Sequence, residues 1–205
     1  IDKDFFREDI PGIRTNKDAS TFDLVLGNAP WGKNTVKKES PAAEWSKKNE
    51  WPTSYNDIGP LFLAKASKLA KADAWVSMIQ PANILLFNRS APAVSLRETL
   101  FKSVRVSEIT NLSALRFVLF NDAVGPACTF TYQNGLPNSQ DVVVYICPKE
   151  NKTSEDDFRI IIATRQVEKS LFIHQIVRCE GDSSYTYLHL ADHSRYTASK
   201  TLKKF

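Results

Sequence analysis

Residues 22–34 have the sequence FDLVLGNAPWGKN, in which an apolar run ends at Gly27 and is followed at once by the tetrapeptide NAPW, residues 28–31. The run FDLVLG predicts a short, largely buried strand of the kind found in parallel sheets. In open α/β sheets, ligands bind beyond the carboxyl ends of the strands. The position of NAPW therefore indicates a functional site at the tip of a strand.

Apolar runs and amphipathic stretches alternate after that strand. Residues 59–72 predict a helix, with Phe62, Ala66 and Leu69 on one face and Lys65, Lys68 and Lys71 on another. A second helix is predicted at 93–103, and further strands at 75–80, 104–112, 127–133 and 141–147. The order predicts an α/β fold with a mainly parallel sheet and an antiparallel element near its end.

Two regions have weaker patterns. Residues 33–54 predict a polar, lysine-rich loop that also holds Trp45 and Trp51. After residue 150, DFRIIIA predicts a strand and RQVEKSLFIHQIV predicts a helix.

Composition sets broad limits. A chain of 205 residues with 42% hydrophobic and 24% charged residues is typical of a globular protein with one domain, or one and a half. The net charge of +4 is compatible with a polyanionic partner but does not identify one. Three cysteines without a CxxC pair argue against a disulfide framework or a structural zinc site and favour the cytoplasm. The apolar runs are too short to span a membrane, so no membrane association is predicted.

FDLVLGNAPW closely resembles motif IV of the amino-group DNA methyltransferases, in particular the N6-adenine branch of bacterial restriction-modification enzymes. KDFF at residues 3–6 resembles the motif that ends the preceding strand, and WVSMIQPANIL and LRFVLFNDAVGPACTFTY resemble later parts. The resemblance covers about residues 1–148. It implies a partial catalytic domain with a Rossmann-like, S-adenosylmethionine-dependent methyltransferase fold whose N-terminal strands are missing. Residues 149–205 are then an extension or the start of another domain.

The chemistry of such an enzyme accounts for the residues at the strand tip. Adenine N6 is a poor nucleophile because its lone pair is delocalised into the ring. Two acceptors directed at its N–H bonds, the Asn28 side-chain oxygen and the Ala29 backbone carbonyl, would localise that lone pair. The resemblance also assigns Pro30 and Trp31 to the catalytic tetrapeptide, with Pro30 beside the cofactor. Ala29 stands where the family usually has a first proline, so a less rigid loop is expected.

The resemblance implies further contacts with double-stranded DNA and with S-adenosylmethionine. A flipped adenine is expected to stack on Trp31, with Phe120 as a second aromatic contact and Lys33 beside the substrate. Asp4 and Phe5 are expected to form part of the cofactor's adenosine pocket. The lysines of the following loop either track DNA phosphates or form an ordinary solvated surface; the sequence leaves both interpretations open.

The family's glycine-bearing cofactor loop has no counterpart in this sequence. We therefore expect the chain to be a piece of a longer protein, with the loop supplied by the rest of that polypeptide or by a partner subunit. Alone, it is expected to bind cofactor poorly and not to methylate. Two other functions remain open at this point. One is methylation of amino groups in RNA or of protein glutamine, and the other is a degenerate, non-catalytic nucleic-acid-binding module.

Overall fold

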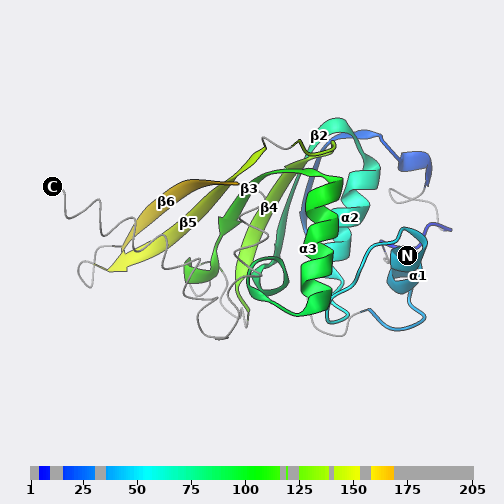
Figure 1. Ribbon diagram of the computed structural model, residues 1–205, viewed down its shortest axis with the longest axis horizontal. Coiled ribbons are helices and arrows are strands. Elements are labelled where there is room, and N and C mark those ends of the chain that lie inside the picture. The colour runs from blue at the N-terminus through cyan, green and yellow to red at the C-terminus, as the bar shows by residue number, and fades with distance from the viewer. Residues whose placement is uncertain are drawn as a thin grey trace.

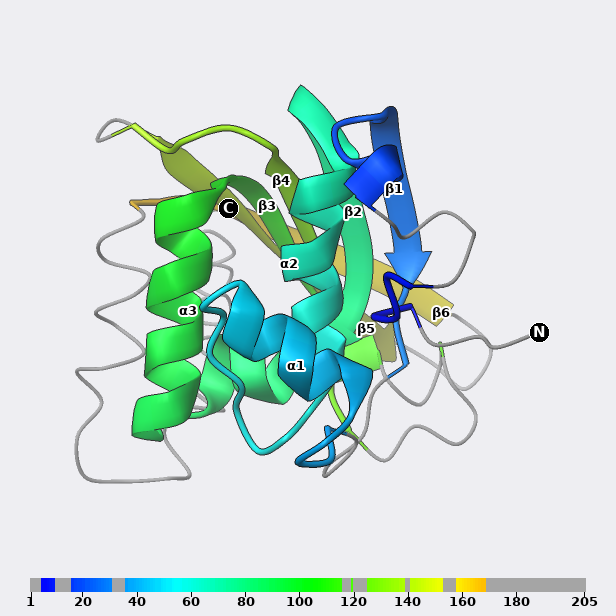
Figure 2. The ribbon, with the colours of Figure 1, turned by 90° about the vertical axis from the view of Figure 1, so that its right-hand side faces the viewer.

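The computed structural model describes residues 5–9, 16–30, 36–115, 119, 125–138, 141–152 and 158–168. A six-stranded sheet in the order β1-β2-β4-β3-β5-β6 carries helices α2 and α3 on one face (Figures 1 and 2). The strands are β1 Phe22–Asn28, β2 Ala70–Pro81, β3 Arg105–Asn111, β4 Ala127–Gln133, β5 Val142–Lys152 and β6 Phe158–Glu168. The α-helices are α1 Pro41–Lys48, α2 Gly59–Leu69 and α3 Ala91–Ser103, and shorter turns are η1 Asn16–Asp18, η2 Asn83–Phe87 and η3 Ser113–Leu115.

The sheet is mixed. β1 pairs with β2 and β3 pairs with β5 in parallel, whereas β4 runs antiparallel to both β2 and β3, and β6 runs antiparallel to β5. Because β4 is reversed between β2 and β3, the four strands β1, β2, β3 and β5 share one direction. The predicted α/β class with a mixed sheet is confirmed, and the antiparallel element includes a strand inside the sheet. β5 continues past residue 148, where the sequence suggested a domain boundary.

The core lies between the sheet and the helices. On β2, Ala74, Val76, Met78 and Gln80 are buried, while the residues between them are at least partly exposed, as expected of a strand covered on one face. Phe130 and Tyr132 of β4 are fully buried against the helices. The Tyr132 hydroxyl donates to the Leu63 carbonyl of α2 at 2.6 Å, which ties the centre of the sheet to its covering helix.

The first strand differs from its prediction. β1 was expected to be largely buried, but Leu24 is 55% exposed and Leu26 is 68% exposed. β1 forms one edge of the sheet and pairs with β2 alone among the described strands. An apolar run cannot distinguish an edge strand from a central one, because strand order is decided by tertiary pairing.

Three other predictions need correction. The expected loop at 33–54 contains α1, which Ser40 caps by accepting a hydrogen bond from Ala43 N at 3.3 Å. The helix expected in RQVEKSLFIHQIV is wrong for residues 165–168, which belong to β6. The helix expected to reach residue 72 ends at Leu69, because Asn134 Nδ2 donates to the Ala70 and Lys71 carbonyls at 2.8 and 3.1 Å and holds that segment in the sheet.

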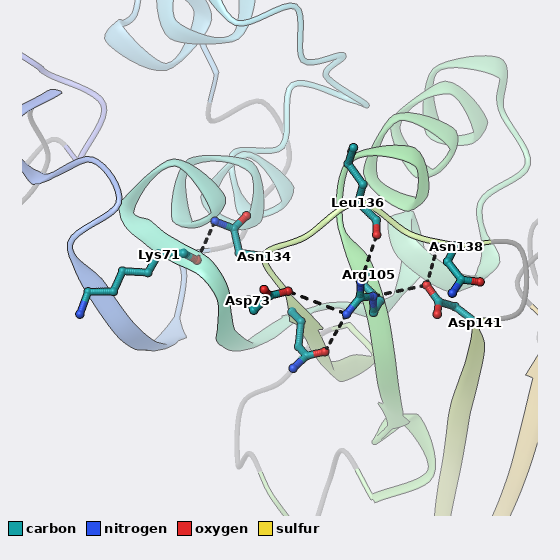
Figure 3. Close-up of polar contacts among 8 residues, drawn as sticks. Lys71, Asp73, Arg105, Asn134, Leu136, Asn138 and Asp141 are labelled. Carbon is teal, nitrogen blue, oxygen red and sulfur yellow. Dashed lines mark hydrogen bonds and ion pairs between the residues drawn. The ribbon is translucent and has the colours of Figure 1, made fainter.

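A polar cluster joins the strands where β2 and β3 begin and β4 ends (Figure 3). At its centre, Arg105 contacts Asp73 Oδ1 at 3.9 Å, Asp141 Oδ2 at 3.6 Å and the Gln133 side-chain oxygen at 3.4 Å. Its Nη2 also donates to the Leu136 carbonyl at 3.4 Å. We call this set the Arg105 cluster; it fixes the β4–β5 connection to the start of β3.

Candidate active site

The tetrapeptide predicted to be catalytic begins at the carboxyl end of β1. Asn28 is the last residue of β1 and lies in parallel register with Ile79 of β2. Parallel pairing places the ends of both strands at one edge of the sheet. Asn28 and Pro30 are exposed, whereas Ala29 is only 5% exposed. The polar side chain is thus presented at the strand tip while the residue after it anchors the chain.

Gly27 permits close packing directly before this tip. A Cβ atom at Gly27 would lie 3.3 Å from the terminal methyl carbon of Met78 and 3.4 Å from its Cγ. Such contacts are tighter than ordinary packing, so a larger residue would have to displace the Met78 side chain. The glycine therefore allows β1 to end close against β2.

A hollow of about 320 Å³ opens beside this tip. We call it the edge pocket, because it lies along β1, the open edge of the sheet. Four of the predicted site residues line it together, namely Phe5, Asn28, Ala29 and Pro30. The remaining lining is apolar and comes from β1, α2 and β2: Phe22, Leu24, Val25, Leu26, Gly27, Phe62, Leu69 and Met78. The structure therefore brings a residue from the KDFF segment to the NAPW segment, across more than twenty positions of sequence.

Asp4, Trp31, Lys33 and Phe120 lie outside the described residues. Their predicted roles remain predictions.

Phe5 is held in the edge pocket by aromatic stacking. Its ring is parallel to that of Phe62 within 7°, with ring centroids 4.8 Å apart. Phe6 packs edge-on against both Phe62 and Trp45, at centroid distances of 5.1 and 5.5 Å. The segment 5–9 is thus fixed to α2 and α1.

A buried lysine completes this attachment, and the sequence did not indicate it. Lys65 was placed on a helix face with Lys68 and Lys71, yet only 1% of it is exposed. Its Nζ donates to the Phe5 carbonyl at 2.7 Å, lies 3.8 Å from Glu8 Oε1, and sits 5.0 Å from the Phe5 ring centroid. A buried ammonium group is tolerated only with such partners. The sequence signal that could have indicated burial was the position of Lys65 between two small apolar residues, Ala64 and Ala66. The structure buries that part of α2.

Two tryptophans of the expected loop are also corrected by the structure. Trp45 is 3% exposed and Trp51 is 8% exposed, and both belong to the hydrophobic core. They are therefore structural residues in this chain.

Other titratable groups near the sheet end are structural. Cys128 lies opposite Gln80 in the β2–β4 register, and its complete burial raises the pKa of the thiol. Arg97 of α3 donates from Nη1 to the Ile84 carbonyl at 2.6 Å, and burial lowers the pKa of its guanidinium to about 10. Cys128 is therefore a neutral, inaccessible thiol rather than a nucleophile, and Arg97 holds η2, the turn that follows β2.

The described residues contain no group of three or more His, Cys, Asp or Glu side chains that could hold a metal ion. The three histidines lie beyond residue 168, outside the described part of the chain. In that described part, no helix combines the length and the apolar character that crossing a membrane requires.

Comparisons with known proteins place the chain in a family and find solved structures to which it is similar. Residues 2–117 match the family model described as Eco57I restriction-modification methylase. None of the curated proteins matches the chain. Among solved structures it is similar to the type IIG restriction endonuclease BpuSI, at 14% identity and a TM-score of 0.60, over 79% of this chain and 21% of that one. It is also similar to the methyltransferase subunit of a type I restriction-modification system from Streptococcus thermophilus, at 14% identity and a TM-score of 0.49, over 89% of this chain and 35% of that one.

At 14% identity, the likeness to BpuSI shows a shared fold alone. The chain spans about a fifth of BpuSI's length.

Proposed function

Because this chain belongs to the Eco57I restriction-modification methylase family, we propose that it forms part of an enzyme that methylates the exocyclic N6 of adenine in DNA, with S-adenosylmethionine as donor. The observation that carries the proposal is the meeting of Asn28, Ala29 and Pro30 with Phe5 in one pocket. Fold alone does not assign an activity, so the proposal rests on these residues and their chemistry.

Asn28 and Ala29 perform the central task in this proposal. The Asn28 side-chain oxygen and the Ala29 carbonyl each accept a hydrogen bond from the N6 amino group, which localises its lone pair for transfer of the methyl group. No covalent intermediate on the protein is required. This agrees with the neutral, buried Cys128, which offers no nucleophile. Trp31 and Phe120 hold the flipped adenine by stacking, which contributes about 1–3 kcal/mol for each base.

The edge pocket fits part of the cofactor. Its volume of about 320 Å³ is at the lower end of the range for small-molecule sites, and its lining is apolar with an aromatic ring at one side. Phe5 and Pro30 would border the adenosine of S-adenosylmethionine, with Asp4 beside it. When bound, the cofactor supplies an electrophilic methyl group. The remaining contacts to it come, in this proposal, from the rest of the same polypeptide or from a partner subunit.

The test is the substitution Asn28→Ala in the intact protein. Loss of one acceptor in a preorganised site is expected to lower kcat for DNA methylation by about 10²–10³-fold, with binding of duplex DNA retained. Asn138→Ala, an exposed asparagine in the β4–β5 connection, is the matched control and should leave kcat unchanged.

The methylated product identifies the substrate. Methyladenine in digested DNA supports the proposal. Methyl groups found in RNA or on protein glutamine would show that this molecule, and not DNA, is the substrate. An intact protein that binds DNA but methylates none of the three would point to a non-catalytic module.

A further inference from the structure

A second and larger hollow lies between α1 and α3, away from the edge pocket. It has a volume of about 630 Å³, and we call it the basic hollow. Lys37, Lys38 and Lys47 contribute three positive charges to its lining, and Glu50 contributes one negative charge. The other lining side chains with hydroxyl or amide groups are Ser46, Thr53, Asn56, Ser95 and Thr99. The lining therefore has a net positive charge, which favours anionic oxygen atoms. The Thr53 and Ser95 hydroxyls can add hydrogen bonds to such atoms, whereas the Ser46 and Thr99 hydroxyls already donate to the Trp51 and Ser95 carbonyls.

The lysines of the basic hollow differ from other lysines in their pairing. Lys37, Lys38 and Lys47 are exposed and form no ion pair with any residue in the described ranges. By contrast, Lys48, the residue after Lys47, donates to Glu8 Oε2 at 3.0 Å. Glu8 thus pairs with a lysine outside the hollow, whereas Lys47, which lines it, has no ion-pair partner among the described residues.

The walls of the basic hollow are held by hydrogen bonds. Val36 N donates to the Asn56 carbonyl at 2.8 Å, and Trp51 N donates to the Ser46 carbonyl at 2.9 Å. Glu50 and Asn56 adopt left-handed backbone conformations with φ of 57° and 51°, which few non-glycine residues do without support from their surroundings. The backbone of the hollow is therefore formed before any ligand arrives, and the ordering cost of binding falls on the exposed lysine side chains.

Its location relates it to the strand tip. Val36, in its lining, follows Asn28 by eight residues, so the two are at most about 28 Å apart. Figure 2 shows α1 at the end of the molecule toward which β1 points. Successive phosphates of a DNA strand are spaced about 3.4 Å apart along the helix axis. A duplex that has one adenine at Asn28 and runs toward α1 would therefore bring phosphates to the hollow within about eight nucleotides of that adenine.

We propose that the basic hollow binds backbone phosphates of the DNA whose adenine is presented to Asn28, through Lys37, Lys38 and Lys47. This inference rests on the proposed function for its choice of DNA as the polyanion. Contacts of this kind position the duplex without reading its sequence. The hollow thus sets the register between the strand tip and the DNA, while specificity is determined elsewhere.

The experiment compares two triple variants of the intact protein that lose the same charge. The first is Lys37→Ala/Lys38→Ala/Lys47→Ala. The matched control is Lys48→Ala/Lys71→Ala/Lys102→Ala, which removes three exposed lysines that are ion-paired outside the hollow. Affinities for a duplex DNA oligonucleotide and for an RNA of the same sequence are measured over a range of salt concentrations, together with methylation at saturating DNA.

We expect the hollow variant to bind duplex DNA on the order of tenfold more weakly, equally for all sequences. Its plot of log affinity against log salt should flatten by about one unit for each phosphate that the variant no longer neutralises. The control should keep the slope of the wild type. Lys47→Glu alone, an exposed change that does not threaten folding, should reproduce the direction of the effect, and Lys48→Glu should not.

The outcomes separate this inference from the proposed function. If the wild type binds and methylates DNA while the hollow variant and the control have equal affinities and slopes, the hollow is not a phosphate site and the proposed function stands. If the hollow variant loses affinity for RNA only, the hollow serves a different nucleic acid and the inference is wrong. If the wild type binds no DNA, both are overturned.

Discussion

The two ends of the sheet are built in opposite ways. Where β2 and β3 begin, the Arg105 cluster links three strands and a turn through side-chain contacts with Asp73, Gln133 and Asp141 (Figure 3). Where β1 ends, Asn28 and Pro30 are exposed beside an open pocket. One end uses its polar groups to hold the fold together, and the other exposes Asn28 at the tip of a strand. A substitution at the first end should therefore alter stability, and one at the second end should alter activity.

The largest expected effect on stability is at Lys65, which holds the segment 5–9 in place and also supports Phe5 in the edge pocket. Lys65→Met removes the ammonium that holds Phe5 and Glu8 while keeping the length of the buried stem. We expect the free energy of unfolding to fall by about 2 kcal/mol, because the Phe5 carbonyl loses its partner and Glu8 keeps, among the described residues, Lys48 alone. Affinity for S-adenosylmethionine should fall as well, since Phe5 lines the edge pocket.

Thermal unfolding and cofactor titration of the intact protein measure the two effects. Lys68→Met, an exposed lysine on the same helix, is the control and should change neither quantity. A Lys65→Met protein with reduced stability but full cofactor affinity would restrict Lys65 to a structural role.

The next effect concerns the pH dependence of stability, through two buried tyrosines of the sheet, Tyr132 and Tyr145. Burial raises the pKa of the Tyr132 hydroxyl above its usual value near 10, and that of Tyr145 likewise. The folded state therefore holds these protons more firmly than the unfolded state. The contribution of these two protonated hydroxyls to the free energy of unfolding is complete below pH 10. It is lost as the pH rises further, by at most about 1.4 kcal/mol per pH unit for each group. Arg97, with a pKa lowered to about 10, acts in the opposite direction above that pH.

Denaturant unfolding of the intact protein between pH 8 and 11 should therefore show a decline that begins near pH 10. Tyr132→Phe should reduce the slope of that decline, and should cost about 1–2 kcal/mol at pH 8 because the Leu63 carbonyl loses its donor. An unchanged slope in the variant would show that Tyr132 does not control the alkaline transition.

The smallest expected effect is at the Arg105 cluster. Arg105→Ala removes several long, partly exposed contacts, which together contribute about 1 kcal/mol. The midpoint of thermal unfolding should fall slightly, and kcat for DNA methylation should remain that of the wild type. Lys102→Ala, which breaks an exposed pair within α3, serves as a control with a smaller loss. If Arg105→Ala lowered kcat for DNA methylation at a temperature where the variant is still folded, the division of roles between the two ends of the sheet would be wrong.

The elements with strong periodic patterns could be predicted from the sequence. The strand at 127–133 has the predicted bounds, and the helix expected at 93–103 begins only two residues earlier. α1 was not predicted, because it is short and has Trp45 as its one large apolar side chain. Ser40 at the N-cap and Pro41 at the first turn were the available signals.

The candidate site was predictable in part. Asn28 could be placed at a strand tip from the apolar run that precedes it, and the structure brings Phe5 to it. The roles assigned to Asn28, Ala29, Pro30 and Phe5 remain predictions. The basic hollow could not be found from its lysines alone, since Lys37, Lys47 and Lys48 look equivalent in the sequence and, of these three, Lys48 is the one that pairs with a described acidic residue.

The sequence by itself determined the class of fold, the position of the NAPW tip after a strand, and the family to which the chain belongs. The class of fold follows from local periodicity. The position of the tip and the family follow from a short motif whose residues are neighbours in the sequence. The tertiary structure alone decided that β1 forms an edge, that β4 lies reversed between β2 and β3, and that Lys65 is buried while Lys47 is not. Burial and charge pairing depend on residues as far as sixty positions away, such as Phe5 and Lys65, and no local pattern records contacts of that range.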